Sequence, residues 1–557
     1  MTFEKANCSF LKVYLIIIMS CVALQCNADA NQTSTLVIDA SDGFRRPIPK
    51  SLFGIFFEEI NHAGAGGLWA ELVNNRGFEA GGTQVPSNID PWTIFGPESS
   101  VLVQTELNSC FERNKVALRI DVLCDNCPPH GVGISNPGFW GMNIVKGKAY
   151  KVVFFARSIG PLNMIVSFRK AQNGAILASS NIKGSATEVS EWKMFQTTLV
   201  AGQTLRNAFR WKDSVGPWEQ RPGHFGDVWN YWTDDGLGFF EGLQLAEDIG
   251  AMPVWVFNSG ISHTDEINTR VIAPFVQEAL DGIEFAIGAP TSRWGSLRAS
   301  MGHPQPFDLK YVGVGNEDCG KLNYHGNYLA FYNAIRHAYP AIQIISNCDA
   351  SAIPLNHPAD LYDYHTYPFD VQQMFSNAHV FDKTPRNGPK AFVSEYALIG
   401  DRQARNGTLF GAVSEAGFLI GLETNSDHVV MACYAPLFVN ANDRKYVFIS
   451  PLKFHLPFLK WSPDAIVFNS NLAYGTPSYW VQYMFRESNG AIFLKSQLHT
   501  TNHHSLAASA ILWQNPQNNK SYLKIKITPQ QSQLQNPGNE MNVIIPPISF
   551  TVFDILR

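Results

Sequence analysis

The sequence predicts a mixed α/β and all-β fold, in which a parallel (β/α)8 barrel is combined with two β-sandwiches. Strands and amphipathic helices alternate between about residues 205 and 440, and several of these strands end in polar residues. This alternation is typical of a parallel barrel, which carries its site at the carboxyl ends of the strands. On both sides of that region, short alternating runs separated by Gly, Asn and Pro indicate β-sandwiches.

Apolar runs identify most of the barrel strands. The first is LFGIFFEE at residues 52–59, and six more lie between residues 253 and 438. Amphipathic segments such as residues 237–250 separate successive strands. A closed barrel of this type has eight strands. The sequence therefore predicts a barrel that is one strand short of closure.

The chain is too long for a single hydrophobic core. It has 557 residues, 45% hydrophobic and 16% charged, and chains of this length divide into two or three domains. The net charge of −5 offers no basic patch for nucleic acid. The predicted segments are a signal peptide at 1–30, a sandwich strand with the first barrel strand and its loop at 31–94, an inserted, truncated sandwich at 95–203, the rest of the barrel at 204–440 and a C-terminal sandwich at 441–557.

The N-terminus has the pattern of a secretory signal. Lys5 and Lys12 precede the apolar run VYLIIIMSCVAL, and Ala28-Asp29-Ala30 fits a cleavage site. This run is shorter than the ~20 residues that a membrane-spanning helix needs, so we expect no membrane anchor. The predicted product is soluble and secreted into the extracellular space. Three sequons then become candidate glycosylation sites, at Asn31, Asn406 and Asn519.

Six cysteines remain after the predicted cleavage. They are Cys110, Cys124, Cys127, Cys319, Cys348 and Cys433. Cys124 and Cys127 have no second pair or histidine at zinc spacing, which favours a disulfide with Cys110 or a neighbouring cysteine over a metal site. The last three lie in predicted barrel strands, where we expect free buried thiols.

Two glutamates at strand ends give the strongest functional signal. The run LKYVGVGNEDCG ends a strand at Glu317, and AFVSEYA ends another at Glu395, 78 residues later. One unit of a ~250-residue barrel takes ~31 residues, so the separation matches a fourth and a seventh strand. Paired carboxylates at barrel strand ends are typical of the active site of a glycosidase. The alternative is that both are surface carboxylates in loop salt bridges.

A further pair of acids ends the first predicted barrel strand. Glu58 and Glu59 are followed by the glycine-rich stretch NHAGAGG. Acids between a strand end and a glycine-rich loop suit a position that lines a substrate site. A pair of acids that caps a short helix is the alternative.

Four long motifs carry a resemblance to a known family. They are GIFFEEINHAGAGGLWAELVNNRGFE, NAFRWKDSVGPWEQRPGHFGDVWNYWTDDGLG, YVGVGNEDCG and AFVSEYA. They resemble the plant-type α-L-arabinofuranosidases of glycoside hydrolase family 51. The resemblance implies a clan-A (β/α)8 barrel, a C-terminal β-sandwich, an inserted carbohydrate-binding-like domain and a retaining mechanism without a cofactor or metal. The implied partners are arabinose-containing wall polysaccharides such as arabinoxylan and arabinan, which would lose terminal arabinofuranosyl groups.

The resemblance also implies roles for individual residues. Glu395 would be the nucleophile and Glu317 the acid/base, and we expect the nearby negative carboxylate to hold Glu317 protonated. The resemblance also implies substrate-binding and site-lining roles for residues at the other strand ends. They are Glu58 as a substrate-binding acid, Asn316 as the partner of the sugar 2-hydroxyl, Trp211 as a site-lining aromatic, and His365 and Tyr367 as the pair near the nucleophile. Trp211 and Tyr367 could instead be core aromatics.

The sequence departs from the family pattern in three places. Residues 195–218 run from the inserted sandwich directly into the loop after the second barrel strand, so that strand itself is missing. An apolar insertion occupies residues 445–460, and residues 523–535 pass quickly toward the last strand. These departures favour a splice variant or an imperfect gene model. The rival interpretation is therefore a catalytically impaired protein that at most binds carbohydrate after secretion.

Another clan-A glycosidase is a further alternative. A β-xylosidase or xylanase would share an Asn-Glu pair and a second glutamate, as in Asn316, Glu317 and Glu395. It should lack the stretch EEINHAGAGGLWAE, which this sequence contains.

Overall fold

The computed structural model describes most of the chain after residue 33. The predicted signal peptide, Asn31, Asn406 and the insertion at 445–460 lie outside the described residues, as do the junction at 196–208 and most of the segment before the last strand. The described residues are 34–69, 71–128, 131–139, 152–169, 176–195, 209–218, 221, 223–226, 228–229, 231–263, 265–399, 407–442, 464–469, 472–500, 506–528 and 550–556.

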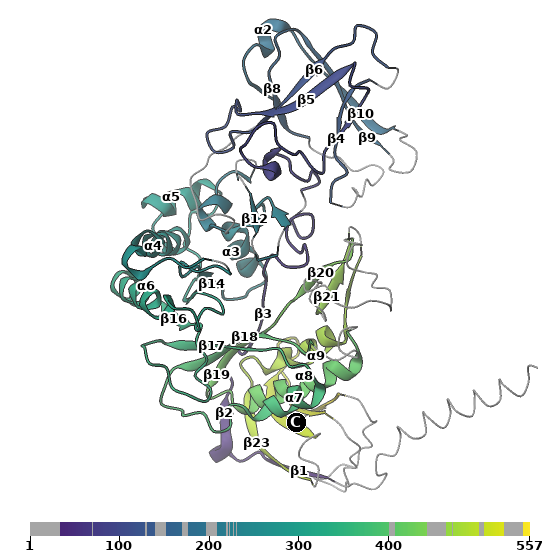
Figure 1. Cartoon of the computed structure of the whole chain (residues 1–557). Coiled ribbons are helices and arrows are strands. Elements are labelled where there is room, and N and C mark those ends of the chain that lie inside the picture. The colour runs from purple at the N-terminus through teal and green to yellow at the C-terminus, as the bar shows by residue number, and fades with distance from the viewer. Residues whose placement is uncertain are drawn as a thin grey trace, which may run out of the picture.

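A parallel seven-stranded sheet forms the centre of the protein, as the sequence predicts (Figure 1). Its strands, in spatial order, are β14 (Val254–Phe257), β15 (Tyr311–Val314), β16 (Gln343–Ser346), β17 (Leu361–Thr366), β18 (Lys390–Tyr396), β19 (Val429–Tyr434) and β3 (Phe53–Ile55). The strands follow chain order except for β3, the first in the chain, which lies at the edge of the sheet and pairs with β19. Within the described residues the sheet is open between β3 and β14, the place of the missing second strand.

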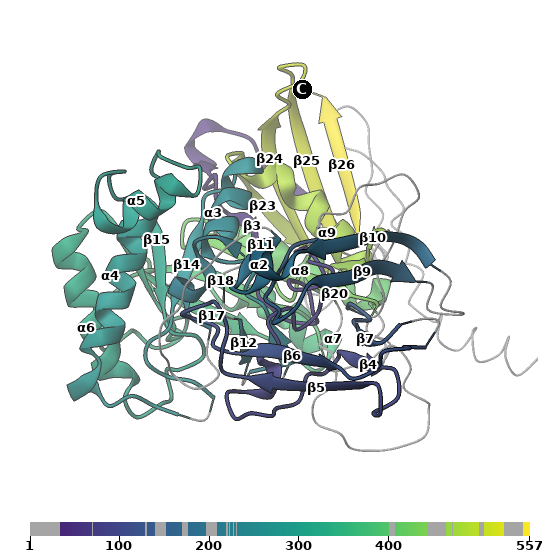
Figure 2. The same cartoon turned by 90° about the horizontal axis from the view of Figure 1, so that it is seen from above.

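Helices cover the outer face of this sheet. In α4 the apolar residues Ala279, Ile283, Phe285 and Ala286 are buried against the strands, while the opposite side is more exposed. Such a one-sided pattern places a helix on the surface of a barrel. Figure 2 shows α4, α5 and α6 along one side. The helices are α3 (Phe239–Asp248), α4 (Ala273–Ile287), α5 (Arg293–Ser300), α6 (Tyr324–Ala338), α7 (Val371–Ser376), α8 (Leu409–Thr424) and α9 (Pro477–Phe485).

The C-terminal part forms an antiparallel six-stranded sheet that includes the first described strand of the chain. Helix α8 contacts this sheet as well as the barrel, so residues 411–423 are all buried. A buried ion pair between Lys526 and Glu423, 2.6 Å apart, joins the two parts. The strands are β1 (Thr35–Asp39), β2 (Arg45–Pro47), β23 (Ile492–His499), β24 (Ala507–Gln514), β25 (Ser521–Thr528) and β26 (Thr551–Leu556).

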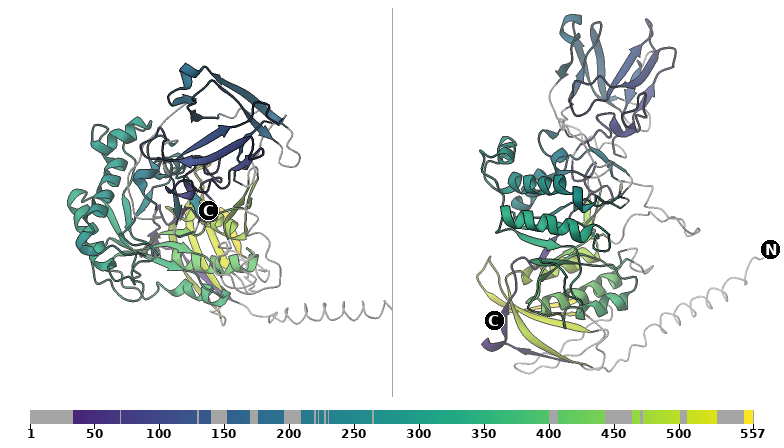
Figure 3. Two further views of the ribbon diagram at one scale, coloured as in Figure 1. Left: turned by 45° about the horizontal axis from the view of Figure 1, so that its top comes forward. Right: turned by 60° about the vertical axis from the view of Figure 1, so that its left-hand side comes forward.

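The inserted segment forms a separate β unit. Figures 1 and 3 show it at one end of the molecule, with the C-terminal sheet at the other. Its strands pair two by two, β4 with β7, β5 with β6, β8 with β11 and β9 with β10. Their bounds are β4 (Thr93–Phe95), β5 (Val101–Glu106), β6 (Ala117–Val122), β7 (Gly133–Ser135), β8 (Phe154–Ala156), β9 (Leu162–Arg169), β10 (Ile176–Gly184) and β11 (Lys193–Phe195), with a short helix α2 (Ala186–Val189).

Two smaller sheets lie between these parts. One pairs β12 with β13, and the other joins β20, β21 and β22. Their bounds are β12 (His224–Gly226), β13 (Tyr231–Thr233), β20 (Phe438–Asn440), β21 (Ile466–Phe468) and β22 (Ala473–Gly475). Short 3-10 helices complete the described elements: η1 (Asp42–Phe44), η2 (Glu79–Gly81), η3 (Trp211–Ser214), η5 (Thr269–Val271), η6 (Asn377–His379) and η7 (Arg486–Ser488). Among the described helices, none has the length and apolar character to cross a membrane.

Candidate active site

The two predicted glutamates lie at the ends of β15 and β18, on the same side of the sheet. Glu317 follows β15 after a tight turn, in which Gly315 has φ +82° and Glu317 itself has φ +54°. A Cβ on Gly315 would lie 2.6 Å from Asp318 Oδ2, so only glycine fits this turn. Glu395 lies in β18, where it is paired in register with His365 of β17. The turn and the strand register therefore set the positions of both carboxylates.

His365 bridges the two glutamates. Its Nδ1 atom lies 3.0 Å from Glu317 Oε1 and 3.6 Å from Glu395 Oε2. The hydroxyl of Tyr367 donates a hydrogen bond of 2.6 Å to Glu395 Oε2. One atom each of Glu317, His365 and Glu395 can be chosen so that all three lie within 4.8 Å of one another. The Glu317 side chain is 59% exposed and that of Glu395 only 10%, so Glu317 faces the solvent and Glu395 lies beneath it.

Glu58 and Asn316 border this cluster. Glu58 follows β3, and burial together with the negative charges of Glu395 and Glu317 raises its pKa to about 8. Asn316 precedes Glu317 and is exposed, and its backbone N–H donates to Asp318 Oδ2 at 3.2 Å. Glu58 therefore lies within electrostatic range of both glutamates, and Asn316 adjoins Glu317 in the chain. Their roles toward a sugar stay predictions.

Trp211 does not belong to the cluster. It begins a short 3-10 helix and is 4% exposed, packed edge-on against Phe239 and Trp294, and its indole N–H donates to the Glu278 backbone carbonyl at 3.0 Å. The prediction of a site-lining aromatic is therefore wrong for this residue in this chain. Trp211 is one of the core aromatics between the helices, the alternative that its apolar context left open.

The charges at the site also differ from the prediction. Burial alone would lower the pKa of His365, but its hydrogen bonds with Asp363 and Glu317 and the nearby carboxylates raise it to about 11. The hydrogen bond from this imidazolium lowers the pKa of Glu317, whereas burial raises that of Glu395. The lowered pKa of Glu317 therefore contradicts the expectation that this carboxyl group is held protonated in the free site, because the hydrogen bond from His365 favours its ionised form.

Comparisons with known proteins agree with this arrangement. The model of the α-L-arabinofuranosidase 1 domain matches residues 197–386, and that of the α-L-arabinofuranosidase C-terminal domain matches residues 394–549. Alpha-L-arabinofuranosidase 1 of Arabidopsis thaliana is 48% identical over 662 positions, covering 99% of this chain and 95% of the relative. Alpha-L-arabinofuranosidase 2 of the same plant is 54% identical over 567 positions, covering 90% and 81%. This chain belongs to the α-L-arabinofuranosidases of glycoside hydrolase family 51.

A solved structure supports the fold. An arabinose-bound α-L-arabinofuranosidase of family 51 superposes with a TM-score of 0.73, covering 94% of this chain and 97% of its own at 24% identity. The alignment with the first Arabidopsis relative spans 662 positions against 557 residues here. At least 105 of those positions therefore have no residue in this family 51 chain, in agreement with the predicted internal deletions.

Two groups at the site escaped the sequence analysis. Asp363 Oδ2 lies 3.0 Å from His365 Nε2, and the Ser394 hydroxyl donates to Asp363 Oδ1 at 2.5 Å. Alternation along β17 places Asp363 and His365 on the same face, two residues apart. Ser394 directly precedes Glu395. The Asp-x-His pattern in the strand that pairs with the strand of Glu395 is the signal that could have revealed this pair.

Glu317, His365 and Glu395 also have the spacing of metal ligands. A metal would need a neutral imidazole nitrogen, whereas the hydrogen bonds and carboxylates around His365 raise its pKa to about 11, which favours the protonated ring. Binding of an ion would therefore have to displace a proton from the ring.

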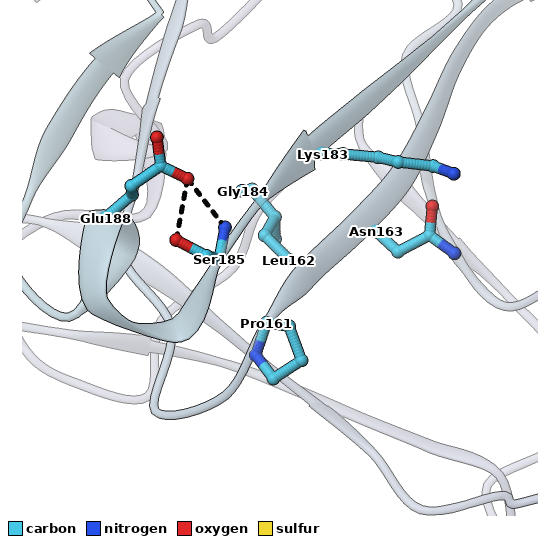
Figure 4. Close-up of a pocket in the computed structure, with 7 residues that line it drawn as sticks. All are labelled: Pro161, Leu162, Asn163, Lys183, Gly184, Ser185 and Glu188. Atoms are coloured by element: carbon cyan, nitrogen blue, oxygen red, sulfur yellow. Dashed lines mark hydrogen bonds between the residues drawn. The ribbon is translucent and has the colours of Figure 1, made fainter.

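The inserted unit has a hollow of a different kind, shown in Figure 4. The Ser185 backbone N–H and hydroxyl both donate to Glu188 Oε2, and the first of these hydrogen bonds belongs to the capping box of α2. They serve the start of that helix. The hollow is lined by Pro161, Leu162, Asn163, Lys183, Gly184, Ser185 and Glu188.

The described cysteines form two disulfides. Cys124 pairs with its neighbour Cys127, and Cys319 pairs with Cys348. Cys110 and Cys433 are free. The expectation of a free buried thiol is correct for Cys433 and wrong for Cys319 and Cys348. Both of these follow strand ends rather than lying inside strands, so the loops that carry them meet at the same edge of the sheet.

The Cys319–Cys348 disulfide holds the loop that carries Glu317. We expect a Cys319→Ser/Cys348→Ser variant to lower the free energy of unfolding by about 3–4 kcal/mol, as for a closed loop of this length. A displaced Glu317 should also lower kcat roughly 10- to 100-fold. Denaturant unfolding and initial rates check both effects. Cys124→Ser/Cys127→Ser is the matched control and should leave kcat unchanged; equal kcat in both variants would contradict the assigned role.

Proposed function

We propose that this chain is a retaining, exo-acting α-L-arabinofuranosidase that removes terminal arabinofuranosyl groups from cell-wall arabinoxylan and arabinan. The single observation that carries the proposal is that one carboxylate oxygen of Glu317 and one of Glu395 lie within 4.8 Å of each other, at the ends of β15 and β18. Carboxyl groups of inverting glycosidases stand about 6.5–9.5 Å apart to admit a water molecule, whereas those of retaining enzymes stand about 5–5.5 Å apart. The short separation therefore favours a covalent route.

In this mechanism the two glutamates act in turn. Glu395 attacks the anomeric carbon while Glu317 gives a proton to the leaving oxygen, and a glycosyl-enzyme forms. Glu317 then takes a proton from the water that releases arabinose from Glu395. The hydrogen bond from Tyr367 holds Glu395 in place for the attack. This chemistry uses only side chains and water, so it requires neither a metal nor an organic cofactor.

Residues at the rim would bind the sugar. Asn316 is exposed directly beside Glu317 and would donate to the 2-hydroxyl, a contact that strengthens as positive charge develops on the sugar. Glu58, which shares its charge environment with both catalytic glutamates, would accept from a further hydroxyl. The site lies at the carboxyl ends of the strands, where a chain end can enter, which suits removal of terminal groups.

We also propose that the chain is exported to its wall substrates. The signal-peptide pattern at the N-terminus supports export. So do the two disulfides, which persist mainly in oxidising compartments. Asn519 is exposed in the turn between β24 and β25, where a glycan would meet no obstacle from the sheet.

One observation favours a second candidate function. The barrel sheet is open between β14 and β3 among the described residues, and Val256 and Ile55 on these edge strands are 48% and 55% exposed. Exposed apolar edges weaken a barrel. A chain that keeps both glutamates on such a sheet could bind wall glycans without hydrolysing them.

Hydrolysis of an aryl α-L-arabinofuranoside by the purified chain separates these functions. We expect release of the aryl group, with the α-anomer of arabinose appearing first in proton NMR spectra. The β-anomer first would contradict the retaining mechanism. Folded protein that retains arabinoxylan on an affinity gel but releases no product would support the binding function. Faster cleavage of an aryl β-xyloside would instead support the other clan-A glycosidases.

A further inference from the structure

His365 is enclosed by charged and polar groups on both of its ring nitrogens. Nδ1 faces Glu317 and Glu395, at 3.0 and 3.6 Å. Nε2 faces Asp363 Oδ2 at 3.0 Å and Ser394 Oγ at 2.8 Å. An imidazolium has two N–H donors, and each of them has an acceptor here. The geometry therefore suits a cationic ring, with the Nδ1 proton directed at Glu317 and the Nε2 proton at Asp363.

This arrangement conflicts with the ordinary role of Glu317. A general acid must carry the proton that it gives to the leaving oxygen. In the free site, however, Glu317 accepts a hydrogen bond from His365 and is ionised at neutral pH, because that contact lowers its pKa. The proton nearest to Glu317 is the one on His365 Nδ1, in direct hydrogen-bond contact with Glu317 Oε1.

We propose that Glu317 and His365 share one catalytic proton, which Asp363 and Ser394 hold on His365 until the sugar is bound. This inference rests on the proposed hydrolytic function. Asp363 and Ser394 are positioning residues, since their side chains form hydrogen bonds with His365 and with each other rather than with a reacting atom. Asp363 supplies the negative charge that stabilises the imidazolium, and the Ser394 hydroxyl fixes the carboxylate by donating to Oδ1.

Sugar binding supplies the reason for the proton to move. The Glu317 side chain is 59% exposed in the free site, so water stabilises its charge. A bound arabinofuranosyl group would cover the Glu317 side chain. Removal of water disfavours the charged pair of the Glu317 carboxylate and the His365 imidazolium relative to the neutral pair. The Nδ1–H bond then breaks and an Oε1–H bond forms, which leaves Glu317 neutral and His365 neutral. His365 keeps its Nε2 proton, which stays hydrogen-bonded to Asp363, so the orientation of the ring is retained.

The proton count closes over both steps. In the first step Glu317 passes the shared proton to the leaving oxygen and becomes a carboxylate. In the second step Glu317 takes a proton from the attacking water, and this proton returns to the Glu317–His365 pair. Asp363 keeps its negative charge throughout. No other proton carrier is needed.

Groups from several elements face His365 and contribute to its charge state. Asp363 belongs to β17, Ser394 and Glu395 to β18, and Glu317 to the loop after β15. Three further groups act at longer range: Glu58 after β3 and the exposed His263 after β14, which act on the glutamates, and the buried thiol of Cys433 in β19 near Asp363. The carboxylates outnumber the cations, which favours the protonated ring.

The decisive experiment changes the charge of Asp363 and follows the pH profile of kcat/KM. In Asp363→Asn we expect His365 to lose its proton at lower pH, so the alkaline limb should move down by about one pH unit or more. On the acid limb His365 still carries its proton, and the charge of Asp363 is one of the causes that raise the pKa of Glu395, so the acid limb should stay in place or move down. The profile therefore loses its alkaline side. Ser394→Ala keeps the charge of Asp363 and should give smaller shifts in the same directions.

Two controls make the result specific. Asp308→Asn removes an exposed carboxylate outside the site and should leave both limbs in place. Thermal unfolding followed by circular dichroism shows that each variant folds. A purely structural role of Asp363 would lower kcat at every pH without moving either limb, and this result would overturn the proposal.

Histidine NMR provides a readout that does not depend on activity. In the unchanged chain we expect the ring signals of His365, assigned by their loss in His365→Asn, to stay in the charged form above pH 9. In Asp363→Asn they should titrate near the ordinary value of about 6.5. Titration near that value in the unchanged chain would overturn the proposal. An inactive chain with a charged His365 would contradict the hydrolytic function and leave the proton placement standing.

Discussion

Replacing Glu395 by Ala is expected to abolish hydrolysis of an aryl α-L-arabinofuranoside, lowering kcat by about 10⁴-fold or more, the scale seen when a covalent nucleophile is removed. The carboxylate is the group that would bond to the anomeric carbon, and Tyr367 holds it there at 2.6 Å. Release of the aryl group, measured by its absorbance, gives the rate. Added azide should restore part of the activity and give the β-configured arabinosyl azide.

The same substitution at an exposed glutamate provides the matched control. Glu247 lies near the end of α3 with a half-exposed side chain, and Glu247→Ala should keep kcat within about twofold because surface changes rarely disturb a site. A Glu395→Ala variant that retains the activity of the unchanged chain would contradict the role of nucleophile.

Replacing Glu317 by Ala should have a different signature. Loss of the acid/base should lower the rate by about 10²–10⁴-fold on substrates with poor leaving groups. It should have less effect on an activated aryl arabinofuranoside, whose leaving group needs no proton. The second step also lacks its base, so the glycosyl-enzyme should accumulate and produce a burst of aryl group. Stopped-flow absorbance measures this burst.

The outcome for Glu317→Ala also separates the two glutamates. Azide should rescue this variant with the α-configured product, because the nucleophile remains and azide replaces water in the second step. Equal losses on good and poor leaving groups, with no burst, would contradict the assignment of Glu317 as acid/base.

The barrel strands and the paired glutamates could be predicted from the sequence for a physical reason. Parallel strands are buried on both faces, so they appear as apolar runs, and a polar residue at such an end marks the edge of the sheet. Glu317 and Glu395 follow this rule, and so does Glu58. The sequence predicts seven barrel strands, and the sheet has seven among the described residues. The missing strand corresponds to the open side between β14 and β3.

Other features depend on contacts between distant segments and could not be predicted in this way. Trp211 matches a motif, but the chain before η3 lacks the second strand, and the indole packs among Phe239, Phe285 and Trp294. The Cys319–Cys348 disulfide needs two loops that meet only after the strands have paired. Local spacing carries no information about either contact.

The charge state of Glu317 is the third such feature. Sequence reasoning placed one negative carboxylate beside it and concluded that it keeps a proton. The fold adds the His365 ring between the two carboxylates and Asp363 behind it. A cation at hydrogen-bond distance outweighs a second carboxylate farther away. The direction of the pKa shift of Glu317 therefore depends on how the charged side chains are arranged in space, which the separate sequence motifs do not specify.

Intact-mass spectrometry of the Glu317→Ala variant tests the central claim most directly. Mixed with an activated aryl arabinofuranoside and quenched in acid, the variant should gain the mass of one pentosyl group. Peptide analysis should place this group on Glu395. Turnover without any adduct, or an adduct on another side chain, would contradict a covalent mechanism built on the Glu317–Glu395 pair.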